Sequence, residues 1–113
     1  MRLRGILFAA LFAAACAPTL RRVDGGITAY ERGEYPLAMQ RFVEAEGDEA
    51  SLGPEISTRY LVYRGLAAWH LGMKAEAKAL LSKGKRAVDA GAGKGIPAAV
   101  VEEMNRALAE LGP

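Results

Sequence analysis

The chain has 113 residues, of which 51% are hydrophobic and 25% charged, a composition that suits one small globular domain. Two of its 15 basic residues, Arg2 and Arg4, lie in an N-terminal segment that we expect to be removed. The rest of the chain carries 13 Lys and Arg against 13 Asp and Glu, so the total charge gives no sign of the basic face that nucleic-acid binding needs. One cysteine cannot form an internal disulfide, and with a single histidine it cannot complete a zinc site, so we expect neither a metal nor another cofactor.

The first 15 residues have the pattern of a signal peptide. Arg2 and Arg4 give a positive start, and Ile6–Ala15 is an apolar run that is too short to span a bilayer. Small residues then precede the only cysteine, Cys16. This arrangement resembles the lipobox of bacterial lipoproteins, although Ala13 stands where that family prefers leucine. The resemblance implies that the leader is cut before Cys16 and that Cys16 carries lipid.

Two other fates of Cys16 stay open. A plain secretory cut after Ala15 would leave a free thiol, and an uncleaved leader would leave an N-terminal helix. Under the lipoprotein resemblance, Ala17 in place of an aspartate implies the outer membrane, with the protein facing the periplasm of the cell envelope. Two or more acyl chains would hold it there stably.

After a short tether over 16–19, the pattern predicts a domain over 20–113 built of five helices. Proline suits a first helical turn and glycine suits a helix end, so these residues set most of the boundaries. The predicted helices run from Leu20 to Arg32, from about Pro36 to near Gly47, from Pro54 to near Gly72, from Lys74 to Ala90, and from Pro97 onward. The last one is amphipathic and suits the end of a helical array, where one face is buried and the other is wet.

The sequence repeats with an offset of 39 residues. Gly26 then aligns with Gly65, Gly33 with Gly72, Ala38 with Ala77, and Phe42 with Leu81. Small and large apolar residues recur where packing would demand them. This small–large pattern resembles the tetratricopeptide repeat (TPR), whose period is 34 residues. The fold we expect is therefore all-α: a short α-solenoid of two TPR-like helical hairpins with a C-terminal capping helix. Gly65 and Ala77 are expected to be close-packing positions.

The TPR resemblance implies a lipid-anchored scaffold that binds an envelope protein or peptide in a concave groove. The groove positions that we single out are Tyr30, Tyr63, Arg64, Trp69 and His70. Alternatives are a structural envelope lipoprotein without a groove, and a small helical enzyme or ligand-binding protein. We expect no enzyme, since no motif surrounds His70, the sole candidate base. For both Trp69 and His70, packing is the favoured interpretation over a place in the groove.

The first hairpin has no predicted cap before it. We therefore expect Val23, Ile27 and Leu37 to keep apolar surface exposed, and Ile27 and Leu37 to dock a partner or a second copy of the chain.

Overall fold

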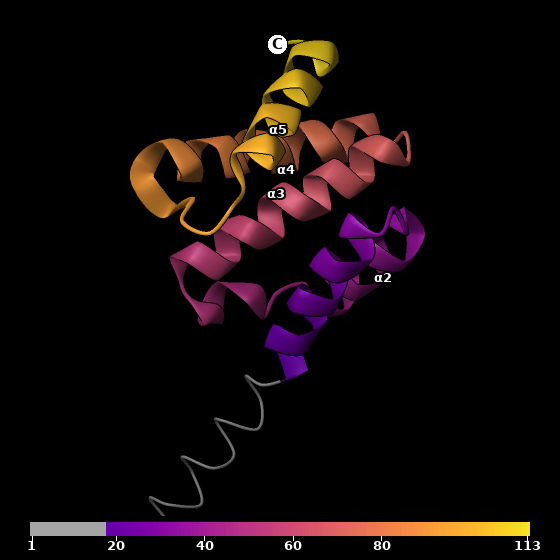
Figure 1. Cartoon of the computed structure of the whole chain (residues 1–113), viewed down its shortest axis with the longest axis vertical. Coiled ribbons are helices and arrows are strands. Elements are labelled where there is room, and N and C mark those ends of the chain that lie inside the picture. The colour runs from indigo at the N-terminus through magenta and orange to yellow at the C-terminus, as the bar shows by residue number, and fades with distance from the viewer. Residues whose placement is uncertain (1–17) are drawn as a thin grey trace, which may run out of the picture.

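The structure is a computed structural model that describes residues 18–113, and this part of the chain is all helix with no strand (Figure 1). The expected all-α class is confirmed. A 3₁₀ turn over Glu49–Leu52 and a wide π-type turn over Val88–Ala92 join longer elements. The five α-helices are the first helix over 18–31, α2 over Tyr35–Glu44, α3 over Pro54–His70, α4 over Lys74–Ala87 and α5 over Ala98–Leu111.

Two details near the N-terminal end differ from the prediction. Residues 18 and 19 are already helical and Thr19 is buried, so the tether predicted to include them is wrong at these two positions. Val23 was expected to be exposed, yet none of its surface is exposed, because it joins the same core as Phe42 and Ala45. Cys16 and the predicted leader lie outside the described residues.

The turns after the first helix and after α3 have the same structure. Gly33 and Gly72 have φ of 75° and 77°, a left-handed conformation that glycine adopts without a steric penalty. The amide of Glu34 donates to the carbonyl of Ala29, and the amide of Met73 donates to that of Ala68, each at 2.9 Å. Each turn also has the 5→2 bond of a Schellman motif, from the glycine amide. Residues that are 39 positions apart in the sequence therefore form two helix ends with the same backbone conformation and hydrogen bonds.

The same offset relates two close helix contacts. A Cβ atom on Gly26 would lie 2.6 Å from the Phe42 ring, and one on Gly65 would lie 2.7 Å from Cδ2 of Leu81. In each helix pair the second helix thus presses a large side chain onto a glycine of the first. Ala77 is fully buried as well. The prediction that Gly65 and Ala77 are close-packing positions is confirmed.

Helix α3 lies at the centre of the arrangement. It packs against α2, α4 and α5, whereas the backbones of α2 and α4 do not approach each other (Figure 1). Its side chains from Val62 to Ala68 are buried without a break, as expected of a helix that others enclose. Because α5 packs on α3 and α4 with Met104 and Ala107 fully buried, it covers their open side. No described helix is both long and apolar enough to cross a bilayer.

Neighbouring glycines in the first helix allow a matched test of this packing. Gly26→Ala should destabilise the fold by about 1–3 kcal/mol, because the added methyl group overlaps the Phe42 ring. Gly25→Ala meets only the Arg41 side chain at 3.9 Å and should stabilise by up to about 1 kcal/mol through helix propensity. Urea denaturation of both variants checks this, and equal shifts of the two midpoints would contradict the contact.

Candidate functional site

A groove opens between the first helix, α3 and the start of α5. Its volume is about 350 Å³. We call it the Tyr63 groove. Its lining comes from the first helix (Asp24, Ile27, Glu31), from α3 (Arg59, Tyr63) and from the connector and start of α5 (Gly95, Pro97, Val100). The first helix and α3 are the leading helices of the two pairs, so one groove draws on both repeats.

The groove has an apolar floor. Ile27 and Val100 are partly buried and pack against the core, and Tyr63 is only 4% exposed. Burial raises the pKa of Tyr63 above its ordinary value, and the nearby Glu31 carboxylate raises it further because a phenolate would face another negative charge. The Tyr63 hydroxyl is therefore a neutral group at the base of the groove.

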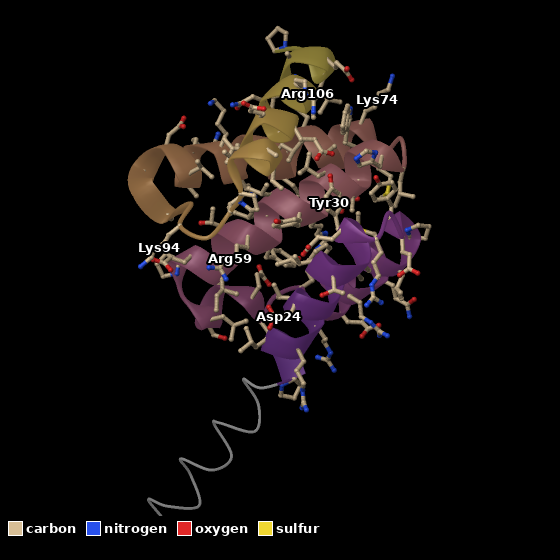
Figure 2. All side chains as sticks on the ribbon, in the orientation of Figure 1. Asp24, Tyr30, Arg59, Lys74, Lys94 and Arg106 are labelled. Carbon is tan, nitrogen blue, oxygen red and sulfur yellow. The ribbon has the colours of Figure 1, made fainter. Side chains whose placement is uncertain are left out.

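Charged residues form the two sides of the groove. Asp24 and Glu31 are exposed on the first helix, and neither lies within ion-pair distance of a cation in the part of the chain that the structure describes. Arg59 lies on α3, across the groove from Asp24 (Figure 2). Its Nη2 donates to the carbonyl oxygen of Lys94 at 3.2 Å.

Gly95 makes room for that arginine. Its φ is 84°, and a Cβ atom at this position would collide with the Arg59 guanidinium. The connector between α4 and α5 therefore requires a glycine here and holds Arg59 against its own backbone. The Arg59 guanidinium thus lies against the connector, on the α3 wall of the groove.

Tyr30, His70 and Glu103 form a polar cluster, the Tyr30 cluster, outside the lining of the Tyr63 groove. The Tyr30 hydroxyl donates to the Glu103 carboxylate, and His70 Nε2 lies 2.8 Å from the same oxygen. Nε2 also lies 3.3 Å from the Tyr30 hydroxyl. Tyr35 stacks on the His70 ring at 4.0 Å between centroids. These contacts tie the first helix, α2, α3 and α5 together at one point.

The Tyr30 cluster should make the folded chain less stable at alkaline pH. Burial raises the pKa of Tyr30 far above its ordinary value of about 10, and the hydrogen bond to Glu103 raises it further. The folded chain therefore keeps the Tyr30 proton after the unfolded chain has released it. The free energy of unfolding contributed by Tyr30 is fully present below pH 10 and falls above it, by up to about 1.4 kcal/mol per pH unit.

Urea denaturation as a function of pH, with and without Tyr30→Phe, measures this effect. The variant should lose less stability per pH unit above pH 10 than the native chain, because it lacks the Tyr30 hydroxyl. It should still lose some, because the pKa values of Tyr60 and Tyr63 are also raised. Equal slopes would show that Tyr30 ionises freely in the folded protein.

The structure separates the groove positions singled out from the sequence. Tyr63 lines the Tyr63 groove, whereas Tyr30 and His70 belong to the Tyr30 cluster and do not line it. Arg64 is 8% exposed and faces away from the groove, toward Glu76, so it offers no surface to a partner there. Trp69 is partly buried and lines a second hollow of about 400 Å³, between α4 and the end of α5, that also contains Lys74 and Lys78.

The two proposed docking residues also lie apart. Ile27 is inside the Tyr63 groove, and Leu37 is 38% exposed on α2. They therefore do not form one docking end, and substitutions at the two positions test different surfaces.

The sequence reasoning missed four charged residues, three in the groove and one in the Tyr30 cluster. Asp24 and Glu31 are spaced so that they share a helix face with Ile27, which was a signal that could have been used. Arg59 precedes Tyr63 by one helical turn and carried the same signal. For Glu103 there was none, since its partners Tyr30 and His70 are 73 and 33 residues away in the chain.

Glu103 accepts from the Tyr30 hydroxyl, and Nε2 of His70 lies closer to the same carboxylate oxygen, at 2.8 Å, than to that hydroxyl, at 3.3 Å. No three His, Cys, Asp or Glu side chains meet as a metal site within residues 18–113. Comparison of the chain with models of protein families, with curated proteins and with solved structures found no match.

Proposed function

We propose that this chain is a lipid-anchored protein-binding scaffold of the bacterial cell envelope, and that it holds a protein segment in the Tyr63 groove. The observation that carries the proposal is that the leading helices of both helix pairs, together with α5, line one groove with an apolar floor and charged sides. Pockets that bind ligands combine these same features.

The repeated geometry supports a TPR-like solenoid as the frame. The two turns share one set of hydrogen bonds, and Gly26–Phe42 and Gly65–Leu81 are equivalent contacts. Leading helices that line a common surface are what a helical array provides, because each repeat packs on its neighbour with a small rotation. α5 then caps the array on the side of α4.

The alternatives make different demands on the molecule. A structural envelope lipoprotein needs no groove, so the Tyr63 groove favours a binding role over it. An enzyme needs a nucleophile or a substrate atom beside its base. In this chain the His70 ring is stacked on Tyr35 and directed at Glu103, which suits a packing role for the histidine.

Site-specific photocrosslinking in membranes of the native organism tests the binding role. A photoreactive amino acid at Glu31, on the side of the groove, should capture a discrete partner, whereas one at Glu102, exposed on α5, serves as the matched control. Capture of a second copy of this chain would identify the partner as a homo-oligomer. Equal labelling from both positions would refute a groove-specific partner.

Two substitutions then separate the groove from α2. Ile27→Glu should abolish capture from position 31, while Leu37→Glu should leave it intact, with helicity checked by circular dichroism in both. Because Ile27 is partly buried, Ile27→Ala provides a milder second variant if the glutamate variant unfolds. Loss of capture with Leu37→Glu alone would move the docking surface to α2.

The anchor is tested separately. We propose that the mature chain begins at Cys16 and carries lipid there, on the strength of the leader and the position of the only cysteine. Mass spectrometry of the mature protein should find acyl groups on Cys16, and Cys16→Ser should release the protein from membranes. An unmodified N-terminus would leave the plain secretory cut as the correct reading.

A further inference from the structure

We infer that the Tyr63 groove selects an extended protein segment in which two basic side chains flank an apolar one. This inference rests on the proposed binding role and names the class of segment that the groove takes. It comes from the order of side chains along the first helix, from the state of the arginine on the opposite wall, and from the size of the groove.

The first-helix wall presents an acidic, an apolar and a second acidic side chain in that order. Asp24, Ile27 and Glu31 follow one another at spacings of three and four residues and therefore share a helix face. At a rise of about 1.5 Å per residue, the two acidic positions are roughly 10 Å apart along the helix. Both carboxylates are exposed and lack a cation partner among the described residues. Two negative charges flanking an apolar step are complementary to two positive charges flanking an apolar side chain.

Arg59, on the opposite wall, does not form an ion pair with the carboxylates of Asp24 and Glu31. The Arg59 guanidinium is hydrogen-bonded to the Lys94 carbonyl and packed against Gly95, so it is held on the side of the connector. In Figure 2, Lys94 lies on the far side of Arg59 from Asp24. The groove is therefore polarised, with its negative side on the first helix. A segment has to enter with its basic side chains toward that helix.

The dimensions favour an extended segment over a helix. About 350 Å³ holds a few side chains, whereas a helix with its side chains is roughly 10 Å across. In an extended polyproline-type conformation, residues three apart lie on the same face and about 9 Å apart. This spacing matches the distance between the two acidic positions. The segment we expect thus has Lys or Arg at two positions three residues apart, on the face toward Asp24 and Glu31. An apolar residue between them lies on another face, which can turn toward the apolar floor of the groove.

Selection from a random peptide library displayed on phage, on the full chain in mild detergent, tests the inference. The enriched peptides should carry Lys or Arg around Leu, Ile, Val or Phe. Fluorescence anisotropy of an enriched peptide should then show weaker binding at higher salt, because the acidic partners are exposed. Enrichment of acidic or uncharged peptides, or of no peptide, would overturn the inference.

Charge-neutralising variants provide the matched comparison. Asp24→Asn and Glu31→Gln should each weaken binding about two- to fivefold, as removal of an exposed ion pair does, and together they should remove most of the salt dependence. Glu34→Gln and Glu102→Gln are exposed carboxylates outside the groove and should change nothing. The charge-reversed pair Asp24→Lys and Glu31→Lys should select acidic peptides instead. Equal effects of the groove and control variants would overturn the inference.

The crosslinking and peptide experiments together distinguish a wrong inference about basic segments from a wrong proposal that the groove binds protein. The photoreactive residue at position 31 itself replaces the Glu31 carboxylate. If it still captures a native partner and adding Asp24→Asn leaves that capture unchanged, the groove binds protein but not through basic side chains. If position 31 captures nothing and no peptide is enriched, the binding role and the inference both fall.

Discussion

Substituting Phe42 with alanine is expected to destabilise the chain by about 3–5 kcal/mol, as removal of a buried aromatic side chain does. Phe42 has no exposed surface, and its ring meets the Tyr60 ring edge-on at 5.9 Å between centroids. It also covers Gly26 in the first helix. The loss would leave a cavity between the first helix, α2 and α3. Since small domains have only about 5–15 kcal/mol of stability, this variant should lose a large share of it and unfold at a much lower urea concentration than the native chain.

The repeat supplies a milder version of the same experiment. Leu81 is the residue that aligns with Phe42 and covers Gly65 in the same way. Phe42→Leu should therefore keep the glycine contact and cost clearly less than Phe42→Ala. If the two substitutions cost the same, the aromatic ring is not packed as the structure has it.

A double variant tests the contact itself. Gly26→Ala is destabilising only while the Phe42 ring is present, so in the Phe42→Ala background its methyl group should fill part of the cavity. The combined loss should then be smaller than the sum of the single losses, with a coupling energy on the order of 1–2 kcal/mol. Urea denaturation of the single and double variants measures this coupling, and simple additivity would contradict the contact.

Helix positions could be predicted from the sequence because local signals fix them. Pro54 and Pro97 stand at the start of α3 and α5, and Gly33 and Gly72 end helices with positive φ. The end of α4 was predicted less well. It was expected at Ala90, whereas the α-helix stops at Ala87 and a wider turn follows.

The residues of the site were harder to predict, because the burial of a charged side chain and contacts between distant residues produce little signal in the local sequence. Arginine is rarely buried, so Arg64 was assigned to a surface, although three acceptors around it allow burial. The repeat showed which helices would lie together. It did not show that Glu103 of α5 would accept a hydrogen bond from Tyr30, because α5 lies outside the two repeated helix pairs.

Arg64 leads to the second prediction of large effect. Its guanidinium donates to the hydroxyl of Tyr60 and lies 2.9 Å from Glu76 on α4. It also lies 3.5 Å from Glu46, just after α2. One buried cation thus joins α3 to α4 and to the end of α2, whose backbone does not reach α4. Burial opposes its charge, but the hydrogen bonds to Tyr60 and Glu76 outweigh burial and raise the pKa of Arg64.

Arg64→Met, which keeps much of the apolar stem, is expected to cost about 1–3 kcal/mol. The buried Tyr60 hydroxyl loses its partner, and a buried polar group left unsatisfied costs about that much. Glu76 and Glu46 add little, because their side chains are 30% and 63% exposed and water can solvate them. The matched control is Lys85→Met in the exposed pair with Asp89, which should cost under about 0.5 kcal/mol.

Removing the Tyr60 hydroxyl, which Arg64→Met leaves without a hydrogen-bond partner, should restore stability. If the cost of Arg64→Met comes from the unsatisfied hydroxyl, adding Tyr60→Phe should recover most of it, since an apolar replacement of a whole buried polar pair is often neutral. Urea denaturation of the two single variants and the double variant decides this. A double variant that is less stable than Arg64→Met alone would mean that the Tyr60 hydroxyl has another role. Because the pair is buried, the loss should also persist at high salt, while any contribution of the Lys85–Asp89 pair should disappear there.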